Sequence, residues 1–258
     1  MNGWQVSSTN GMYSTEIFME CANSWAGYYD EMFLWLNGRE FLDDWKIKKL
    51  TACATGYIYT YKSHQTNPGG YKIRETPLQL GYNLLANSEI GIKPPDYIMQ
   101  FDADEAMPEH SKFHEYFLAW LASDSPCMCC NWIYFWNDYE TLRVDKFASQ
   151  SPHGFFFKAY DKEGLAPFTW RPYGGGGRPR SIPLSECWIC PYPVRHYNHI
   201  NRATRQRYVD NEKTQILKHL SDKDRPTHYQ VNPKKVTTIE YDPEITCADI
   251  ERQQSSCR

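Results

Sequence analysis

The first hundred residues alternate short strand-like runs with helix-like runs, and this alternation constrains the fold more than any other feature of the sequence. The strand-like runs are continuous and apolar, whereas the segments between them repeat apolar residues at helical spacing. Strands that alternate with helices form a parallel sheet, because each helix returns the chain to the same end of the sheet. The sequence therefore predicts an α/β fold with a mostly parallel sheet flanked by helices.

The expected elements of this first half are four strands and three helices. The strands are expected at 4–8, 32–36, 57–61 and 97–101, and the helices at 16–25, 41–54 and 77–86. Ser14 is the expected N-cap of the first helix. Ligands of such sheets bind beyond the carboxyl ends of the strands, so we expect functional residues directly after each strand.

The second half of the chain is rich in aromatic residues and differs in pattern. A helix opened by Pro108 is expected at 109–122, followed by β-favouring runs at 127–136, 141–147 and 155–160. A last helix is expected at 203–220, and then one strand at 236–241 with a loose tail. No sharp domain boundary is expected, only a soft transition near 102–126.

Composition excludes several classes of protein. The chain has 258 residues, of which 41% are hydrophobic and 23% charged, so a disordered or fibrous chain is excluded. No apolar run is long enough to span a membrane, and residues 1–11 do not resemble an export signal, which favours a cytoplasmic location. The formal net charge of −3 gives nucleic-acid binding no support.

The nine cysteines are an odd number and are clustered in the sequence. Three of them are Cys127, Cys129 and Cys130, and Cys187 and Cys190 form a CxxC pair. Two such clusters are compatible with zinc, but CxCC is not a usual ligand spacing, so reduced thiols are the favoured interpretation.

The strongest chemical signal is a group of carboxylates after the expected strand 97–101. Asp102, Asp104 and Glu105 lie within four residues of one another, and like charges this close need a cation or solvent to compensate them. Mg²⁺ and Mn²⁺ prefer such oxygen ligands together with substrate phosphates. The alternative is a solvated acidic turn that caps the next helix.

Four stretches of the chain resemble the family 2 glycosyltransferases of the GT-A fold, which is Rossmann-like. They are Glu16–Trp25 with Tyr29-Asp30-Glu31 after it, Gly69–Asn83, the DxD-containing stretch Asp96–Pro108, and Arg195-His196-Tyr197. The resemblance spans about residues 4–210 and is clearest in the first half. It implies one GT-A-like catalytic domain over 1–220, with a nucleotide-sugar-binding half at 1–107, an acceptor-binding half at 108–220, and a C-terminal extension at 221–258.

The resemblance also implies a donor site. Asp102 and Asp104 would hold Mn²⁺ or Mg²⁺, with His196 as a later ligand or a direct partner of a phosphate. Arg74 would pair with the diphosphate of a nucleoside-diphosphate sugar, for which a UDP-sugar is expected. Asn10 and Asn37, on turns after two strands, would lie near the nucleoside, although Asn in a turn is commonly turn chemistry alone.

An inverting transferase needs a general base for the acceptor hydroxyl, and the sequence leaves its identity open. Glu186, ten residues before His196, ranks first, ahead of Asp145 and Asp138. The family's later acidic motif is not evident, and Asn37-Gly38-Arg39 replaces its usual acidic residue after the second strand.

The acceptor is also left open between a glycan, a lipid-linked sugar, a protein and a hydroxymethylated DNA base. An aromatic belt is suited to stacking against sugars or bases, or to packing as core: Trp132, Tyr134, Phe135, Trp136 and Tyr139. Residues 195–225 hold eight Lys or Arg against four Asp or Glu, which predicts a basic patch that includes His196, His199, Arg202, Arg205 and Arg207.

Two other functional classes compete with a glycosyltransferase. A nucleotidyltransferase should carry a Gly-rich phosphate loop near its N-terminus, which Ser7-Ser8-Thr9-Asn10-Gly11 does not supply. A non-catalytic module that binds nucleotides or sugars on the same fold is the third interpretation, because a fold alone does not prove activity.

Overall fold

The structure is a computed structural model of the chain. It describes residues 1–10, 15–37, 45, 48, 52, 54–60, 95–145, 152–158, 182–211, 233 and 236–256. The expected helix 77–86 and Ser14 lie outside these residues, and so does most of the expected helix 41–54.

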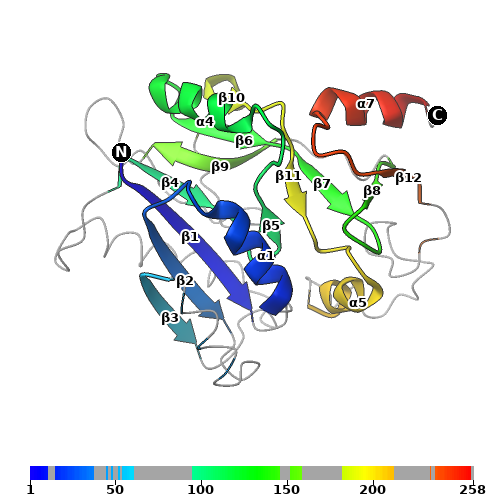
Figure 1. Cartoon of the computed structure of the whole chain (residues 1–258), viewed down its shortest axis with the longest axis horizontal. Helices are drawn as coiled ribbons and strands as arrows, with labels where there is room; N and C mark the ends of the chain where they lie inside the picture. Colours follow the sequence, from blue (N-terminus) through cyan, green and yellow to red (C-terminus); the bar gives the residue numbers. More distant parts are fainter. Residues whose placement is uncertain are drawn as a thin grey trace. The chain divides into compact units, whose positions relative to one another are not determined.

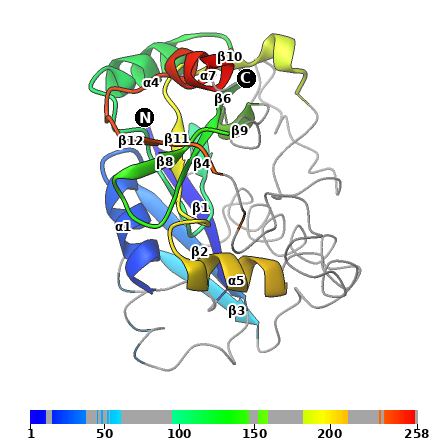
Figure 2. The ribbon, with the colours of Figure 1, turned by 90° about the vertical axis from the view of Figure 1, so that its right-hand side faces the viewer.

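The larger sheet has seven strands in the order β10-β6-β9-β4-β1-β2-β3, and β1 to β4 come from the first hundred residues. Its strands are β1 (Gly3–Asn10), β2 (Glu31–Asn37), β3 (Gly56–Thr60), β4 (Tyr97–Gln100), β6 (Cys127–Cys130), β9 (His153–Lys158) and β10 (Trp188–Ile189). Strand β1 pairs in parallel with β2 and β4, and β2 pairs in parallel with β3, whereas β9 is antiparallel to β4. Figures 1 and 2 show β1 between β2 and β4. The predicted α/β fold with a mostly parallel central sheet is confirmed.

Helix α1 (Thr15–Trp25) connects β1 to β2 and packs through its apolar residues. Trp25 at its end contacts Phe101, with ring centroids 6.0 Å apart, and Phe101 contacts Phe155 at 4.9 Å. Gly27, at a φ of +88°, turns the chain after the helix, which a side chain would oppose. Large buried rings therefore form the core beside the sheet.

A five-stranded sheet is built from the second half, in the order β12-β8-β7-β11-β5. Its strands are β5 (Glu105–Ala106), β7 (Trp132–Phe135), β8 (Thr141–Arg143), β11 (Val194–His196) and β12 (Thr238–Glu240). The run 127–136, expected to be uniformly β-favouring, is divided at Asn131 into β6 and β7, which belong to different sheets.

Three further helices and one 3₁₀ turn, η3 (Leu184–Glu186), complete the described elements: α4 (Phe113–Ala122), α5 (Arg202–Asn211) and α7 (Cys247–Ser256). Helix α4 begins four residues later than predicted. Before the helix, the carboxylate of Glu109 pairs with Arg195 at 2.7 Å and accepts a hydrogen bond from Tyr241. The loose tail predicted after residue 241 is wrong for residues 247–256, which form α7.

The chain divides into two compact units. Unit 1 comprises Met1–Ala103, Asp124–Cys129 and Gly154–Trp188, and unit 2 comprises Asp104–Ser123, Cys130–His153 and Ile189–Arg258. The seven-stranded sheet lies mainly in unit 1 and the five-stranded sheet in unit 2. Among the described helices, none is long and apolar enough to cross a membrane.

Candidate functional site

Asp104 and His196, 92 positions apart in sequence, form a buried pair within unit 2. The Nε2 atom of His196 lies 3.2 Å from Oδ2 of Asp104, and the two residues are 9% and 3% exposed. Backbone pairing brings them together, because β5 and β11 are antiparallel with Glu105 opposite His196. The N–H of Tyr197 also donates to the carbonyl of Asp104 at 2.8 Å.

This pair has the donor atoms of a divalent-cation site. A carboxylate oxygen and an imidazole nitrogen are common ligands of Mn²⁺, and burial favours a compensating charge. Asp102, the other predicted ligand, is half-buried and belongs to unit 1. Asp104 and His196 are therefore a pair of potential ligands. Within the described ranges, the one group of three potential metal ligands consists of cysteines.

Aromatic side chains surround His196. Its ring centroid lies 5.2 Å from that of Trp132 and 5.2 Å from that of Tyr134. Strand β7 pairs in parallel with β11, with Tyr134 opposite His196, and alternation along β7 places Trp132 and Tyr134 on the same face. Tyr134 also contacts His199, at 5.5 Å.

Two guanidinium groups lie over the ring of Trp136. The carbon Cζ of Arg205 is 4.1 Å from the ring centroid and that of Arg143 is 5.0 Å. Arg205 donates hydrogen bonds to Oδ1 of Asn137 at 3.1 Å and to the carbonyl of His199 at 2.9 Å. Burial, and then the charge of Arg143, lowers the pKa of Arg205. Both guanidinium groups are therefore buried against Trp136, and that of Arg143 is also paired with Asp145.

The sequence did not predict this arrangement of Arg143, Trp136 and Arg205. Arg143 is in the short strand β8 and Arg205 is in helix α5, so no local spacing joins them. Asn137, which accepts a hydrogen bond from Arg205, has a φ of 72° in the sharp turn after β7.

The aromatic belt divides between two environments. Tyr134, Phe135 and Trp136 are buried, whereas Tyr139 is 47% exposed. Phe135 packs on the ring of Tyr197, with centroids 5.0 Å apart, so it belongs to the core. Trp132 and Tyr134 are the members beside His196.

The expected basic patch at 195–225 is wrong as a surface feature for several of its members. Arg195, His199 and Arg205 are buried, and Arg195 is bound by Glu109 and by the hydroxyl of Tyr197. Arg202 is exposed at the start of α5. The side chain of Arg207 lies outside the described part.

The predicted nucleoside-binding residues Asn10 and Asn37 end neighbouring strands. They are register partners at the carboxyl ends of β1 and β2, in unit 1. Their side chains lie outside the described part of the structure, as does the whole of Arg74.

The candidate bases occupy different settings. Glu186 is exposed on η3 in unit 1. In unit 2, Oδ2 of Asp145 accepts a hydrogen bond from Nε of the buried Arg143 at 2.7 Å. The carboxylate of Asp138 accepts from the N–H groups of Glu140 and Thr141, and the first of these bonds lowers its pKa. Glu186 and Asp145 stay predictions, and Asp138 has a local turn-forming role.

Comparison with known proteins identifies no family for the chain. No protein-family model matches the chain, and no curated protein sequence matches it. Among solved structures, the chain is similar to 4-diphosphocytidyl-2C-methyl-D-erythritol synthase from Anaerococcus prevotii, with 13% identity and a TM-score of 0.32 over 61% of this chain and 70% of that one. A TM-score of this size defines no shared function, so the function is inferred from this chain's own residues.

Proposed function

We propose that the protein is a metal-dependent glycosyltransferase that moves a sugar from a nucleoside-diphosphate sugar, with UDP as the expected carrier, to an acceptor hydroxyl. The observation that supports it is the buried Asp104–His196 pair, which joins the DxD segment after β4 to the His-Tyr segment of β11. These are two of the segments on which the resemblance to GT-A glycosyltransferases rests.

The donor set fits Mn²⁺ or Mg²⁺, since it offers a carboxylate and an imidazole. Asp104 and His196 would hold the ion. When bound, such an ion stabilises the negative charge that develops on the departing diphosphate. Asn10 and Asn37, at adjacent strand ends, are assigned to the nucleoside, and Arg74 to the diphosphate.

The acceptor half of the proposal rests on the aromatic face of unit 2. Trp132 lies beside His196 and is half-buried, and an indole ring stacks well on the apolar face of a sugar. The acceptor stays open between a glycan, a lipid-linked sugar, a protein and a hydroxymethylated DNA base, because Arg143 and Arg205, over Trp136, are buried. Glu186 and Asp145 are the proposed candidates for the base that deprotonates the acceptor hydroxyl.

The test is thermal melting of the full chain against nucleoside diphosphates and nucleotide sugars, with and without Mn²⁺. A ligand that binds only the folded state at a hundredfold excess over its Kd stabilises it by about 2.7 kcal/mol. We expect a shift for one nucleotide that requires Mn²⁺, and its loss in Asp104→Asn and His196→Ala. Turnover, followed as release of the nucleoside diphosphate, should fall by about a hundredfold or more in Asp104→Asn, because metal stabilisation is worth several kcal/mol.

The matched control is Glu251→Gln, which also neutralises one carboxylate but lies exposed on α7. It should keep both the Mn²⁺-dependent shift and turnover. Normal nucleotide binding and turnover in Asp104→Asn would contradict the metal assignment. Mn²⁺-dependent nucleotide binding without any release of nucleoside diphosphate, across a panel of acceptors, would instead indicate a binding module.

A further inference from the structure

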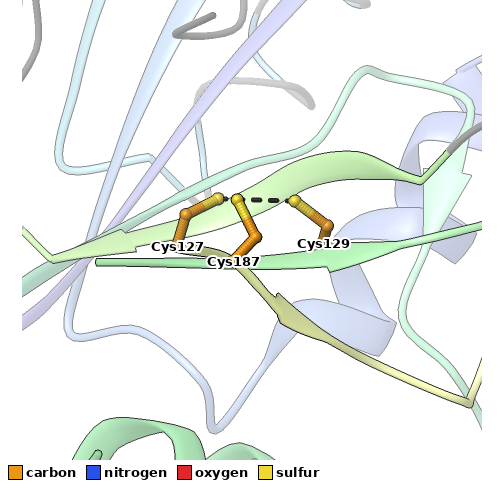
Figure 3. A group of neighbouring side chains, drawn as sticks. All are labelled: Cys127, Cys129 and Cys187. Atoms are coloured by element: carbon orange, nitrogen blue, oxygen red, sulfur yellow. Dashed lines mark hydrogen bonds between the residues drawn. The ribbon is translucent and has the colours of Figure 1, made fainter. Parts of the chain in front are cut away.

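Three cysteine thiols from two distant parts of the sequence meet in unit 1. Cys127 and Cys129 are on β6, and Cys187 directly precedes β10, the strand next to β6 in the sheet. Their Sγ atoms all lie within 4.8 Å of one another, and those of Cys127 and Cys129 are 3.6 Å apart. Figure 3 shows the three thiols pointing toward one another.

The spacing of the sulfur atoms fits thiolate coordination of a metal. Zinc–sulfur bonds are about 2.3 Å, so the sulfur atoms of a tetrahedral site lie about 3.8 Å apart. The separation of 3.6 Å between Cys127 and Cys129 is close to that edge. Residues two apart on a strand face the same side, which explains why these two thiols converge and Cys130 does not join them.

A disulfide accounts for this geometry less well. Cα atoms two apart on a strand are separated by about 6.6 Å, which is at the long end of the range for disulfides. A bond from Cys187 to either neighbour would use two sulfur atoms and leave the third beside it. A metal ion uses all three thiols.

The surrounding backbone holds the two segments together. The hydroxyl of Ser125 lies 3.1 Å from the carbonyl of Cys127 and 2.8 Å from that of Glu186, so it bridges the residues next to the cluster. A Cβ added to Gly154 on β9 would lie 2.8 Å from the ring of Phe157 and 3.0 Å from Sγ of Cys127. The missing side chain at Gly154 therefore leaves room for this thiol.

We propose that Cys127, Cys129 and Cys187 bind one Zn²⁺ ion as thiolates, with a fourth position for water or another ligand. Soft thiolate ligands select Zn²⁺ over Mn²⁺ or Mg²⁺, so this site is independent of the Asp104–His196 pair. Each cysteine that is a thiol before binding releases its proton to solvent and binds the ion as a thiolate.

The experiment measures zinc bound to the full-length reduced chain by elemental analysis, and its affinity by competition with a chromophoric chelator. We expect about one Zn²⁺ per chain, and at least a tenfold loss of affinity in Cys127→Ser, Cys129→Ser and Cys187→Ser. X-ray absorption of the zinc-loaded protein should show three sulfur neighbours at about 2.3 Å. Cobalt in place of zinc should give thiolate-to-metal charge-transfer absorption that Cys187→Ser weakens.

Cys247→Ser is the matched control, because Cys247 is half-buried like Cys187 but lies outside the cluster, with its thiol directed to the carbonyl of Cys190. It should bind zinc as the natural chain does. Gly154→Ala keeps every ligand but crowds Cys127, so it should weaken binding without abolishing it. Circular dichroism of each variant verifies that it is folded.

Three results would overturn the proposal. One is a folded, reduced natural chain that takes up no zinc. Another is zinc affinity that Cys187→Ser and Cys129→Ser leave unchanged. The third is a disulfide within the trio that persists in reductant when zinc is supplied.

Discussion

At the scale of single residues, the start of β1 depends on one missing side chain. A Cβ on Gly3 would lie 2.3 Å from the ring of Tyr97, so only glycine lets that ring lie against the strand. The hydroxyl of Tyr97 donates to the carbonyl of Tyr28 at 2.8 Å. The carboxylates of Asp30 and Asp96 accept from the N–H groups of Gly3 and Asn2. The phenol therefore lies near two negative charges in a buried position.

These surroundings predict a loss of stability at alkaline pH. Burial, and then the charges of Asp30 and Asp96, raises the pKa of Tyr97 from 10.0 to about 12. The neutral phenol stabilises the folded state fully below pH 10, and this contribution is lost as pH rises to about 12, because the unfolded chain ionises first. The loss is on the order of 2 kcal/mol.

Urea unfolding at a series of pH values measures this loss of stability at alkaline pH. Between pH 10 and 12 the free energy of unfolding should fall more steeply for the natural chain than for Tyr97→Phe, which has no ionisable group there. The control is Tyr139→Phe, at a phenol that is 47% exposed, and it should follow the natural chain. Parallel curves for the natural chain and Tyr97→Phe would refute the prediction.

At the scale of elements, the C-terminal helix α7 has a clear N-terminal cap. Thr246 and Asp249 form a reciprocal arrangement: Oδ2 of Asp249 accepts from the N–H of Thr246 at 2.9 Å, and Oγ1 of Thr246 accepts from the N–H of Asp249 at 3.3 Å. The N–H of Cys247 donates to the carbonyl of Pro191 and so joins the helix to the chain before β11. The T-x-x-D pattern was present in the sequence, although the segment was predicted to be a loose tail.

Removing this cap should destabilise the protein measurably. Thr246→Ala loses the side-chain bonds at the helix start and should lower the free energy of unfolding by about 1 kcal/mol. Thr246→Ser keeps a hydroxyl in the same place and should lose much less. Chemical denaturation of the three proteins measures the difference, and equal stability of Thr246→Ala and the natural chain would show that the cap contributes nothing.

The four strands of the first half were predictable because each depends on local pattern. The strands around 4–8, 32–36, 57–61 and 97–101 are confirmed as β1, β2, β3 and β4, within one or two residues at each end. Apolar runs that end at polar turns carry this information within a few residues. By contrast, nothing in the run 127–136 shows that the chain changes sheets at Asn131, because both strands are apolar and buried.

The candidate site was predictable only in part, because its residues are brought together by tertiary pairing and not by local pattern. The segments of Asp104 and His196 were recognised from a family resemblance, and their 3.2 Å separation depends on the pairing of β5 with β11. The thiol trio joins Cys187 to Cys129 and Cys127, which lie far earlier in the sequence. The sequence neighbour Cys190 lies in unit 2 instead. The spacing of residues in the sequence does not show which distant segments pair in the fold.

At the scale of the whole molecule, neither unit is a continuous piece of chain. The chain passes from one unit to the other after Ala103, Ser123, Cys129, His153 and Trp188. Unit 1 therefore needs segments that follow the first part of unit 2. The division expected at residue 107 lies close to the first of these passages, but later segments return to unit 1.

A fragment of residues 1–107 should therefore fail to fold alone. It lacks β6, β9 and β10, and so exposes the edge of β4 that β9 covers in the full chain. We expect no cooperative unfolding transition in circular dichroism, in contrast to the full chain measured in parallel. A cooperative transition of the fragment would show that its four parallel strands suffice.

The same passages set the order of events during synthesis. Strand β4 lacks its neighbour β9 until a further 50 or so residues have been made, and β10 is the last strand of that sheet to leave the ribosome. During that interval an apolar strand edge is open to other chains. Slower translation over residues 101–190 would lengthen this exposure, so the yield of soluble protein should depend on chaperones that hold nascent chains.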